Sequence, residues 1–178
     1  MIWDFLIWLE GTDISTWARE GDFIVPGFAT FYALLGIHSV GMAVVVGICL
    51  MISSRLFGFQ LSMSVQRANE LMGFAWWGFY VNLFSGIILY VAQPVRELMT
   101  VLFWVKIIVI VFAVITMRVI QKGLNSLETI PNPNGTGTVE VVPLGLRVSA
   151  FVLDIFWLAA IVSGRLIGYT QPPPGLNY

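Results

Sequence analysis

The longest uncharged segment of the sequence is Phe23–Ser54, which reads FIVPGFATFYALLGIHSVGMAVVVGICLMISS. It lies between Asp22 and Arg55 and contains no charged residue. A helix needs about 20 mostly apolar residues to cross the hydrocarbon core of a bilayer. We therefore expect the first membrane-spanning helix inside this stretch, at Gly27–Ser53.

Three further segments have the required length and apolar character: Leu71–Gln93, Leu98–Gln121 and Arg147–Tyr169. Pro94 is expected to stop the first of these, because proline lacks the N–H that a helix interior needs. The alternating segments of about 10 residues that build membrane β-barrels are not seen. The sequence thus predicts an all-α integral membrane protein, an antiparallel four-transmembrane-helix bundle over residues 23–170.

The composition excludes whole classes of function. The chain has 178 residues, of which 58% are hydrophobic and 11% are charged, whereas a soluble domain carries about 25% charged residues. The net charge is −1 and no basic block is present, so we expect no nucleic acid partner. The expected partners are membrane lipids and other membrane or periplasmic protein subunits.

Residues 1–22 are too short and too charged to span a membrane. Apolar side chains recur there at helical spacing, at Ile2, Phe5, Leu6 and Leu9. We expect an amphipathic helix at the membrane surface, because tryptophan favours the headgroup level. The expected interface anchors are Trp3, Trp8, Trp17 and Arg165. Asp13 or Ser15 is expected to cap a second short helix.

Basic residues predict the orientation. One face of the predicted bundle collects Arg55, Arg67, Arg118, Lys122 and Arg147. The other collects Arg19, Arg96 and Arg165 together with five acids. The positive-inside rule places the first face in the cytoplasm, with the loop 122–146 and a small hairpin that includes Thr138–Val142. Both termini, including the proline-rich tail 171–178, are then periplasmic in a bacterial inner membrane.

Four polar side chains fall well inside the predicted spans, one from each helix: His38, Asn82, Lys106 and Asp154. Ionisable groups in the hydrocarbon region are costly, so these residues are the first candidates for a functional site. We expect all four to point into the bundle as an intramembrane polar cluster. Lys106 and Asp154 either form a buried ion pair, or Lys106 extends its ammonium towards the headgroups.

His38 has three interpretations: a structural histidine hydrogen-bonded to Asn82 or a serine, an axial ligand of a b-type haem, or a proton-relay group. Haem in a four-helix bundle usually takes two axial side chains at one depth, and His38 is the only histidine. Met117 lies about 12 Å deeper along the bundle axis than His38, and Met99 is displaced in the opposite direction. A haem at His38 would therefore take Lys106 or a residue of another chain as its second ligand, or would hold a five-coordinate iron. No metal site is expected.

The chain resembles a family of bacterial four-helix inner-membrane proteins known only as a domain of unknown function. Short motifs carry the resemblance, in this order: Trp8–Glu10, Trp17–Glu20, His38, Arg55–Gly58, Ser85–Tyr90 with Pro94 and Arg96, Phe103–Lys106, and Ser163–Tyr169. Members often have a second histidine near the end of the third helix, where this chain has Met117. The resemblance implies the four-helix fold and a bacterial origin.

No set of catalytic residues is evident, so the leading hypothesis is a non-catalytic subunit or anchor of a larger inner-membrane complex, respiratory or redox in type. The first alternative is a small b-type cytochrome that passes electrons between quinol and a periplasmic acceptor. A weaker alternative is a proton or ion pathway along His38, Asn82 and Asp154. Candidate ligands are haem b, a bound lipid and a quinone.

Overall fold

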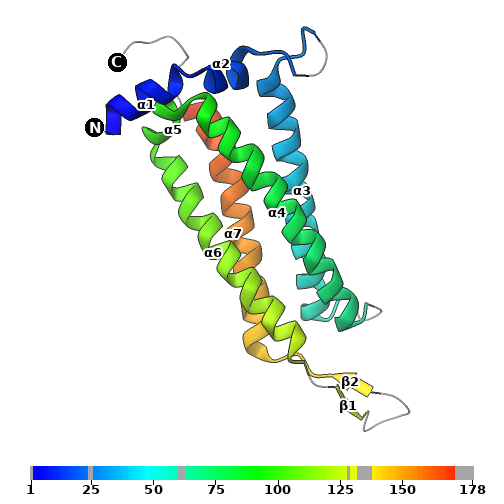
Figure 1. Ribbon diagram of the computed structural model, residues 1–178. Coiled ribbons are helices and arrows are strands. Elements are labelled where there is room, and N and C mark those ends of the chain that lie inside the picture. Colours follow the sequence, from blue (N-terminus) through cyan, green and yellow to red (C-terminus); the bar gives the residue numbers. More distant parts are fainter. Residues whose placement is uncertain (1, 24–25, 60–62, 128, 132–137, 171–178) are drawn as a thin grey trace.

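Four long helices make up most of the molecule in the computed structural model (Figure 1). The structure describes residues 2–23, 26–59, 63–127, 129–131 and 138–170. The long helices are α3 (Thr30–Phe57), α4 (Val65–Ala92), α6 (Val101–Asn125) and α7 (Leu144–Thr170). All four are long and apolar enough to cross a membrane.

The helices associate as two close pairs, α3 with α4 and α6 with α7, which meet through α3–α7 and α4–α6 contacts. Three short helices, α1 (Ile2–Glu10), α2 (Asp13–Glu20) and α5 (Pro94–Leu98), lie across one end (Figure 1), which we call the α1–α2 end. The opposite end, where the strands β1 (Thr129–Pro131) and β2 (Thr138–Glu140) project, is the hairpin end.

The outward faces of the long helices are apolar. Bulky side chains expose half or more of their surface on every long helix, among them Val40, Trp77, Phe84, Ile108, Phe151 and Leu158. Soluble monomers rarely expose contiguous apolar patches above a few hundred Å². The exposed surface therefore fits a multi-pass membrane protein, in which lipid covers these side chains.

The first long helix is displaced from its predicted bounds of 27–53. It begins at Thr30, because Gly27 has a positive φ of 84° and its N–H is held by the Asp22 carboxylate at 3.0 Å. It ends at Phe57, where Gly58 takes the left-handed conformation and the Phe59 N–H bonds the Ser54 carbonyl at 3.0 Å. This is the Schellman pattern that glycine favours.

The second long helix starts earlier than predicted, at Val65 rather than Leu71, because the Ser64 hydroxyl caps it by accepting from the Arg67 N–H. Pro94 does end this segment, but it also begins α5, in the first helical position that proline tolerates well. The other two spans, predicted at 98–121 and 147–169, are found at Val101–Asn125 and Leu144–Thr170.

The amino-terminal segment forms two short helices. The N-cap of α2 is Thr12, whose hydroxyl accepts from the Ser15 N–H, so the predicted caps Asp13 and Ser15 were wrong. Ser15 instead donates its hydroxyl to the Ala92 carbonyl at 3.4 Å, and Arg19 donates to the same oxygen at 3.3 Å. These two bonds attach α2 to the carboxyl end of α4, where helix carbonyls lack intrahelical partners.

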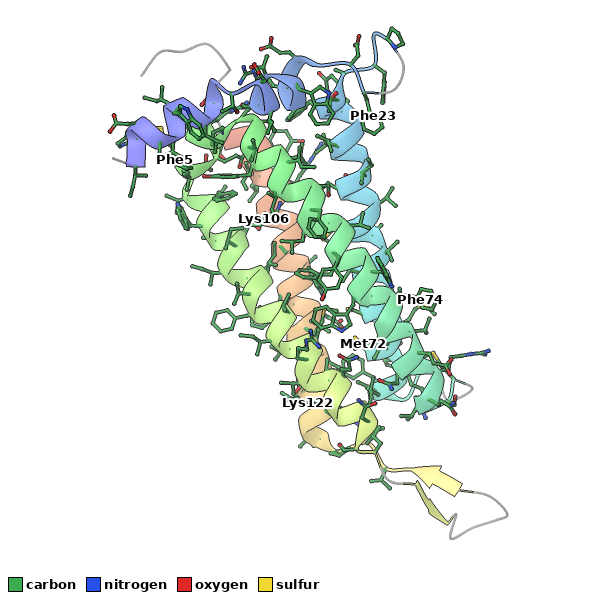
Figure 2. The ribbon with its side chains drawn as sticks, viewed as in Figure 1. Phe5, Phe23, Met72, Phe74, Lys106 and Lys122 are labelled. Carbon is green, nitrogen blue, oxygen red and sulfur yellow. The ribbon has the colours of Figure 1, made fainter. Side chains whose placement is uncertain are left out.

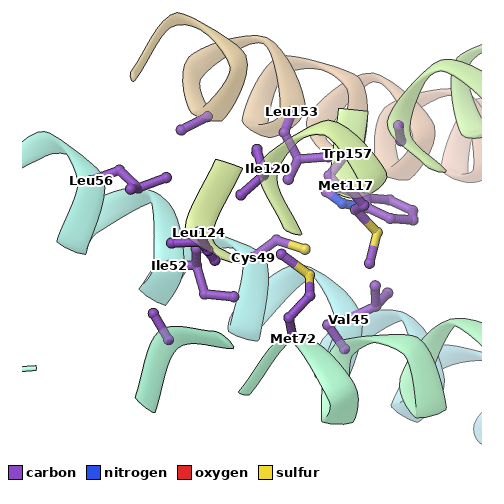
Figure 3. Close-up of a cluster of buried hydrophobic side chains, with 14 of the residues drawn as sticks. Val45, Cys49, Ile52, Leu56, Met72, Met117, Ile120, Leu124, Leu153 and Trp157 are labelled. Atoms are coloured by element: carbon purple, nitrogen blue, oxygen red, sulfur yellow. The ribbon is translucent and has the colours of Figure 1, made fainter. Parts of the chain in front are cut away.

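The apolar core occupies the hairpin half of the bundle. Figure 3 shows side chains from all four long helices converging there: Val45, Cys49, Ile52, Leu56, Met72, Met117, Ile120, Leu124, Leu153 and Trp157. All of them are buried. In the α1–α2 half, α6 has no fully buried residue between Val101 and Phe112, and a smaller apolar cluster of Ala18, Leu34 and Ala92 joins α2, α3 and α4.

The predicted hairpin is present as a two-stranded antiparallel sheet that pairs Thr129 with Glu140 and Pro131 with Thr138. The turn that joins the strands, and the predicted proline-rich tail 171–178, lie outside the described residues.

Candidate functional site

Close approach of α3 and α4 brings the polar residues of these helices together. A Cβ atom at Gly41 would lie 2.8 Å from the main-chain nitrogen of Asn82, and one at Gly78 would lie 2.9 Å from that of Val45. Small residues at such positions let membrane helices pack backbone to backbone. The polar groups one turn away can therefore bond the opposite main chain.

His38 and Asn82 are joined by a reciprocal pair of hydrogen bonds. The Nδ1 atom of His38 lies 2.9 Å from the main-chain oxygen of Asn82. The carboxamide Nδ2 of Asn82 donates to the main-chain oxygen of His38 at 2.8 Å. Each side chain thus bonds the backbone of the other residue, and the pair fixes the register of α3 against α4.

These bonds determine the tautomer of His38. A carbonyl oxygen only accepts, so Nδ1 must carry a proton to bond Asn82. The Ser85 hydroxyl, 3.2 Å from Nδ1, donates its own proton to the Val81 carbonyl at 2.6 Å and accepts from the imidazole. In the neutral ring, the lone pair is then on Nε2.

The Nε2 atom of His38 has no hydrogen-bond partner within the described part of the chain. Gly86 makes room for the ring edge, because a Cβ atom there would lie 3.0 Å from Cε1 and 3.4 Å from Nδ1. A histidine whose Nδ1–H is held by a backbone carbonyl presents Nε2 as an acceptor or as a metal ligand. His38 is therefore oriented by α4 and open on its other nitrogen.

Lys106 supplies a cation to the same half of the bundle. Figure 2 shows it reaching from α6 towards α7, where its Nζ and Cε lie 3.4 and 3.5 Å from the Cβ position of Gly164. Lys106 interacts electrostatically with His38 and with Glu97 of α5. Lys106 therefore belongs to the α1–α2 half, and its ammonium lies against α7.

An aromatic pair lies next to the polar groups, on the side of the α1–α2 end. Tyr90 of α4 and Phe103 of α6 stack with ring centroids 5.6 Å apart and planes at 20°. Tyr90 is one turn beyond Gly86, and Phe103 is one turn before Lys106. We call the set His38, Asn82, Ser85, Gly86, Tyr90, Phe103, Lys106 and Gly164 the His38 site.

Asp154 lies elsewhere, in the hairpin half. Its Oδ1 accepts from the Ser53 hydroxyl at 2.8 Å, and Ser53 is about 22 Å from His38 along α3. Buried apolar side chains, including Val45, Met117 and Trp157, fill the interior between them. Of the four residues in the predicted polar cluster, His38, Asn82 and Lys106 therefore share one half, and Asp154 has a separate partner.

Neither Met117 nor Met99 is placed to give a haem at His38 a second axial ligand. Met117 is fully buried in the apolar core of the hairpin half, with α4 and α7 side chains around it. Met99 is exposed at the end of α5. No group of three or more His, Cys, Asp or Glu side chains placed to hold a metal occurs among the described residues.

The predicted interface anchors are all exposed. Trp3 and Trp8 lie on α1 and Trp17 lies on α2, each with 45–63% of its surface accessible. Arg165 packs its guanidinium over the Tyr169 ring at 5.1 Å, near the carboxyl end of α7. Their position at the α1–α2 end is consistent with the predicted role as anchors at the membrane interface, which stays a prediction.

Several residues of the site were missed from the sequence. Gly86 and Gly164 were not among the predicted site residues, although each lies against a polar side chain. Ser53, the partner of Asp154, gave no signal, because a serine inside a span is common and its partner is 101 residues away. The spacing of Asn82, Ser85 and Gly86 on one helix face was the usable clue.

Comparison of the chain with protein-family models, with curated proteins and with solved protein structures finds no match.

Proposed function

We propose that this protein is a non-catalytic integral subunit of a larger membrane complex of the respiratory or redox type. In this proposal the four long helices form an antiparallel bundle in a bacterial inner membrane. The short helices α1 and α2 lie in the periplasmic interface, and both termini are periplasmic. The basic residues at the hairpin end support the orientation, because they favour the cytoplasmic side.

The subunit proposal rests on the apolar side chains that are exposed around α1. Leu6 is its one buried side chain and faces the bundle. Trp3 and Ile7 are exposed on one flank of Leu6, and Phe5 and Trp8 are exposed on the other. A surface helix can bury one flank in lipid, whereas a helix that is apolar around most of its circumference is normally covered on both sides. A protein partner on the second flank accounts for this pattern.

The test is purification of the tagged chain from its native membrane in mild detergent, followed by mass spectrometry. We expect a stoichiometric partner that is lost when Trp3 and Ile7, or Phe5 and Trp8, are replaced by serine. The matched control replaces the exposed Val40 and Phe84, which lie on the spans. A chain that purifies alone contradicts the proposal.

A b-type haem at His38 is the second candidate function, and the tautomer of His38 favours it. Haem-ligating histidines hold Nδ1–H on a carbonyl and present Nε2 to the iron, as His38 does. An absorption spectrum of protein purified from haem-replete cells tests this candidate. It predicts a Soret band that is absent in His38→Ala, and a colourless wild-type protein contradicts it.

A further inference from the structure

Trp76 of α4 holds two polar side chains of α6 in the hairpin half of the bundle. The Arg118 guanidinium lies over the Trp76 ring, with its Cζ atom 4.1 Å from the ring centroid. The indole Nε1–H of Trp76 donates to the Gln121 side-chain oxygen at 3.1 Å. Arg118 and Gln121 are three residues apart on α6 and lie on one face of that helix. A single aromatic side chain thus fixes the positions of both groups.

The groups on this face offer hydrogen-bond donors. An indole nitrogen can only donate, so Gln121 gives its oxygen to Trp76 and keeps its Nε2 amide for another acceptor. Arg118 and Lys122, one turn apart on α6, are both exposed. Within the described segments of the chain, neither cation has a carboxylate partner, and the Arg118 N–H groups have no acceptor. Two cations and one amide therefore lie together without an anion.

The height of these groups on α6 matches the headgroup layer of a bilayer. The helix has 25 residues and ends at Asn125, so it is about 37 Å long, against about 30 Å for the hydrocarbon core. Figure 2 shows Lys122 near the hairpin end of α6, about 5 Å from the helix end, and Arg118 lies about 6 Å deeper. Side chains of this length extend their charge to the headgroups.

An apolar stripe continues from Arg118 towards the middle of α6. Ile115, Val111 and Ile107 precede Arg118 by 3, 7 and 11 residues, which keeps them on the same helix face. Each exposes 40–53% of its surface. A basic group at the headgroup level with an apolar stripe below it is the order of groups that a phospholipid complements, with its phosphate above its acyl chain.

We infer that Arg118, Gln121 and Lys122, with Trp76 as their platform, bind the head group of an anionic phospholipid from the leaflet at the hairpin end. The three residues are called the Arg118 face. The planar guanidinium donates to the phosphate through two N–H groups, a geometry that arginine favours. Lys122 and the Gln121 amide donate to the remaining oxygens of the head group. Basic groups between membrane helices on the cytoplasmic side typically bind anionic lipid head groups in this way.

Charge complementarity favours an anionic lipid over other occupants. A zwitterionic head group would place its own cation beside Arg118 and Lys122. Inorganic phosphate would satisfy the donors but leave the apolar stripe uncovered. An acidic protein segment would have to reach Arg118 about 10 Å from the end of α6, where lipid surrounds a spanning helix. The inference concerns lipid binding and is independent of the subunit proposal.

The experiment is native mass spectrometry of the purified full-length chain in mild detergent, titrated with phosphatidylglycerol or with phosphatidylcholine of the same acyl chains. We expect one phosphatidylglycerol per chain, bound at least tenfold more tightly than phosphatidylcholine. Arg118→Gln should weaken phosphatidylglycerol binding about tenfold, since it removes charge-assisted hydrogen bonds, and should leave phosphatidylcholine binding unchanged. Arg118→Lys should recover only part of the loss, because an ammonium lacks the planar fork.

The matched control is Arg67→Gln. Arg67 is exposed at the same end of the bundle, but it lies nine residues before Trp76 and so on the opposite side of α4. It removes the same charge, and phosphatidylglycerol should bind this variant as it binds wild type. Equal losses in Arg67→Gln and Arg118→Gln would show general attraction to a basic surface and overturn the inference.

The wild-type protein alone also tests the inference, so a variant that misfolds does not prevent a decision. Equal binding of phosphatidylglycerol and phosphatidylcholine overturns it, as does displacement of phosphatidylglycerol by an equal concentration of inorganic phosphate. A protein partner that is lost in Arg118→Gln and retained in Arg67→Gln also overturns it, because the Arg118 face is then a protein contact. A chain that purifies without any partner contradicts only the subunit proposal.

Discussion

His38 and Asn82 each hydrogen-bond the main chain of the other: the imidazole Nδ1 bonds the Asn82 carbonyl at 2.9 Å, and the Asn82 carboxamide bonds the His38 carbonyl at 2.8 Å. One pair of residues thereby sets the register of α3 against α4 and the tautomer of the histidine. The structural role of His38 and its open Nε2 are consequences of the same bonds.

Replacement of Asn82 by alanine should destabilise the protein by about 1 kcal/mol, the scale of a hydrogen bond between membrane helices. The main-chain bond from His38 remains, so α3 and α4 should stay paired. Unfolding by SDS titration in mixed micelles measures the change. Ser39→Ala is the control, because its exposed hydroxyl bonds only Leu35 of its own helix. Equal stability of Asn82→Ala and Ser39→Ala would contradict the assigned bond.

Gly41→Ala should cost more than any single polar replacement at the α3–α4 contact. Its Cβ atom would meet the Asn82 backbone at 2.8 Å and the Gly78 carbonyl at 3.0 Å, neither of which can move without separating the helices. We expect a loss of about 1–3 kcal/mol. Gly36→Ala on the same helix meets nothing within 4 Å and should be neutral or slightly stabilising. Thermal unfolding in detergent compares the two variants, and similar midpoints would refute the close contact.

Trp76 connects α4 to α6 near the hairpin end. Its ring lies under the Arg118 guanidinium at 4.1 Å, and its Nε1–H donates to the Gln121 side chain at 3.1 Å. Trp76→Phe keeps an aromatic face but loses the donor, so we expect a loss of about 1 kcal/mol, against about 3–5 kcal/mol for Trp76→Ala. The exposed Trp77→Ala is the matched control, measured in the same SDS titration. A Trp76→Ala variant as stable as the control would be inconsistent with this contact.

Asp154 should not support ion passage. Its carboxylate is bonded to Ser53, and the buried apolar side chains of the hairpin half lie between it and the His38 site. We therefore expect liposomes with wild-type protein and with Asp154→Asn to show the same proton flux as empty liposomes, measured with an internal pH dye under an imposed gradient. A flux that depends on wild-type protein and disappears in Asp154→Asn would contradict this expectation.

Local chemistry explains how much of the fold was predictable. Apolar length identified all four long helices, and Pro94 marked the end of one correctly. The exact bounds depended on interactions that a hydropathy pattern does not contain, such as the Ser64 cap and the left-handed Gly58. Thr12 was passed over as a cap because Asp13 and Ser15 are equally good caps in isolation.

The candidate site was predictable in part. The free-energy cost of placing a polar side chain inside a membrane points to the residues concerned, but not to their hydrogen-bond partners. His38, Asn82 and Lys106 were identified as costly inside a membrane, and the structure places them in one half of the bundle. The separation of Asp154 depends on which face of α7 meets α3, and side-chain depth alone does not determine this.

The hydrogen bonds from α4 hold His38 as the Nδ1–H tautomer and leave Nε2 open. Solid-state NMR of protein labelled with ¹⁵N-histidine in lipid bilayers tests this tautomer directly, because the chain has one histidine and every imidazole signal reports His38. We predict a protonated Nδ1 and an unprotonated Nε2, because Nδ1 bonds the Asn82 carbonyl. A proton on Nε2 in the neutral ring, with Nδ1 bare, would contradict it.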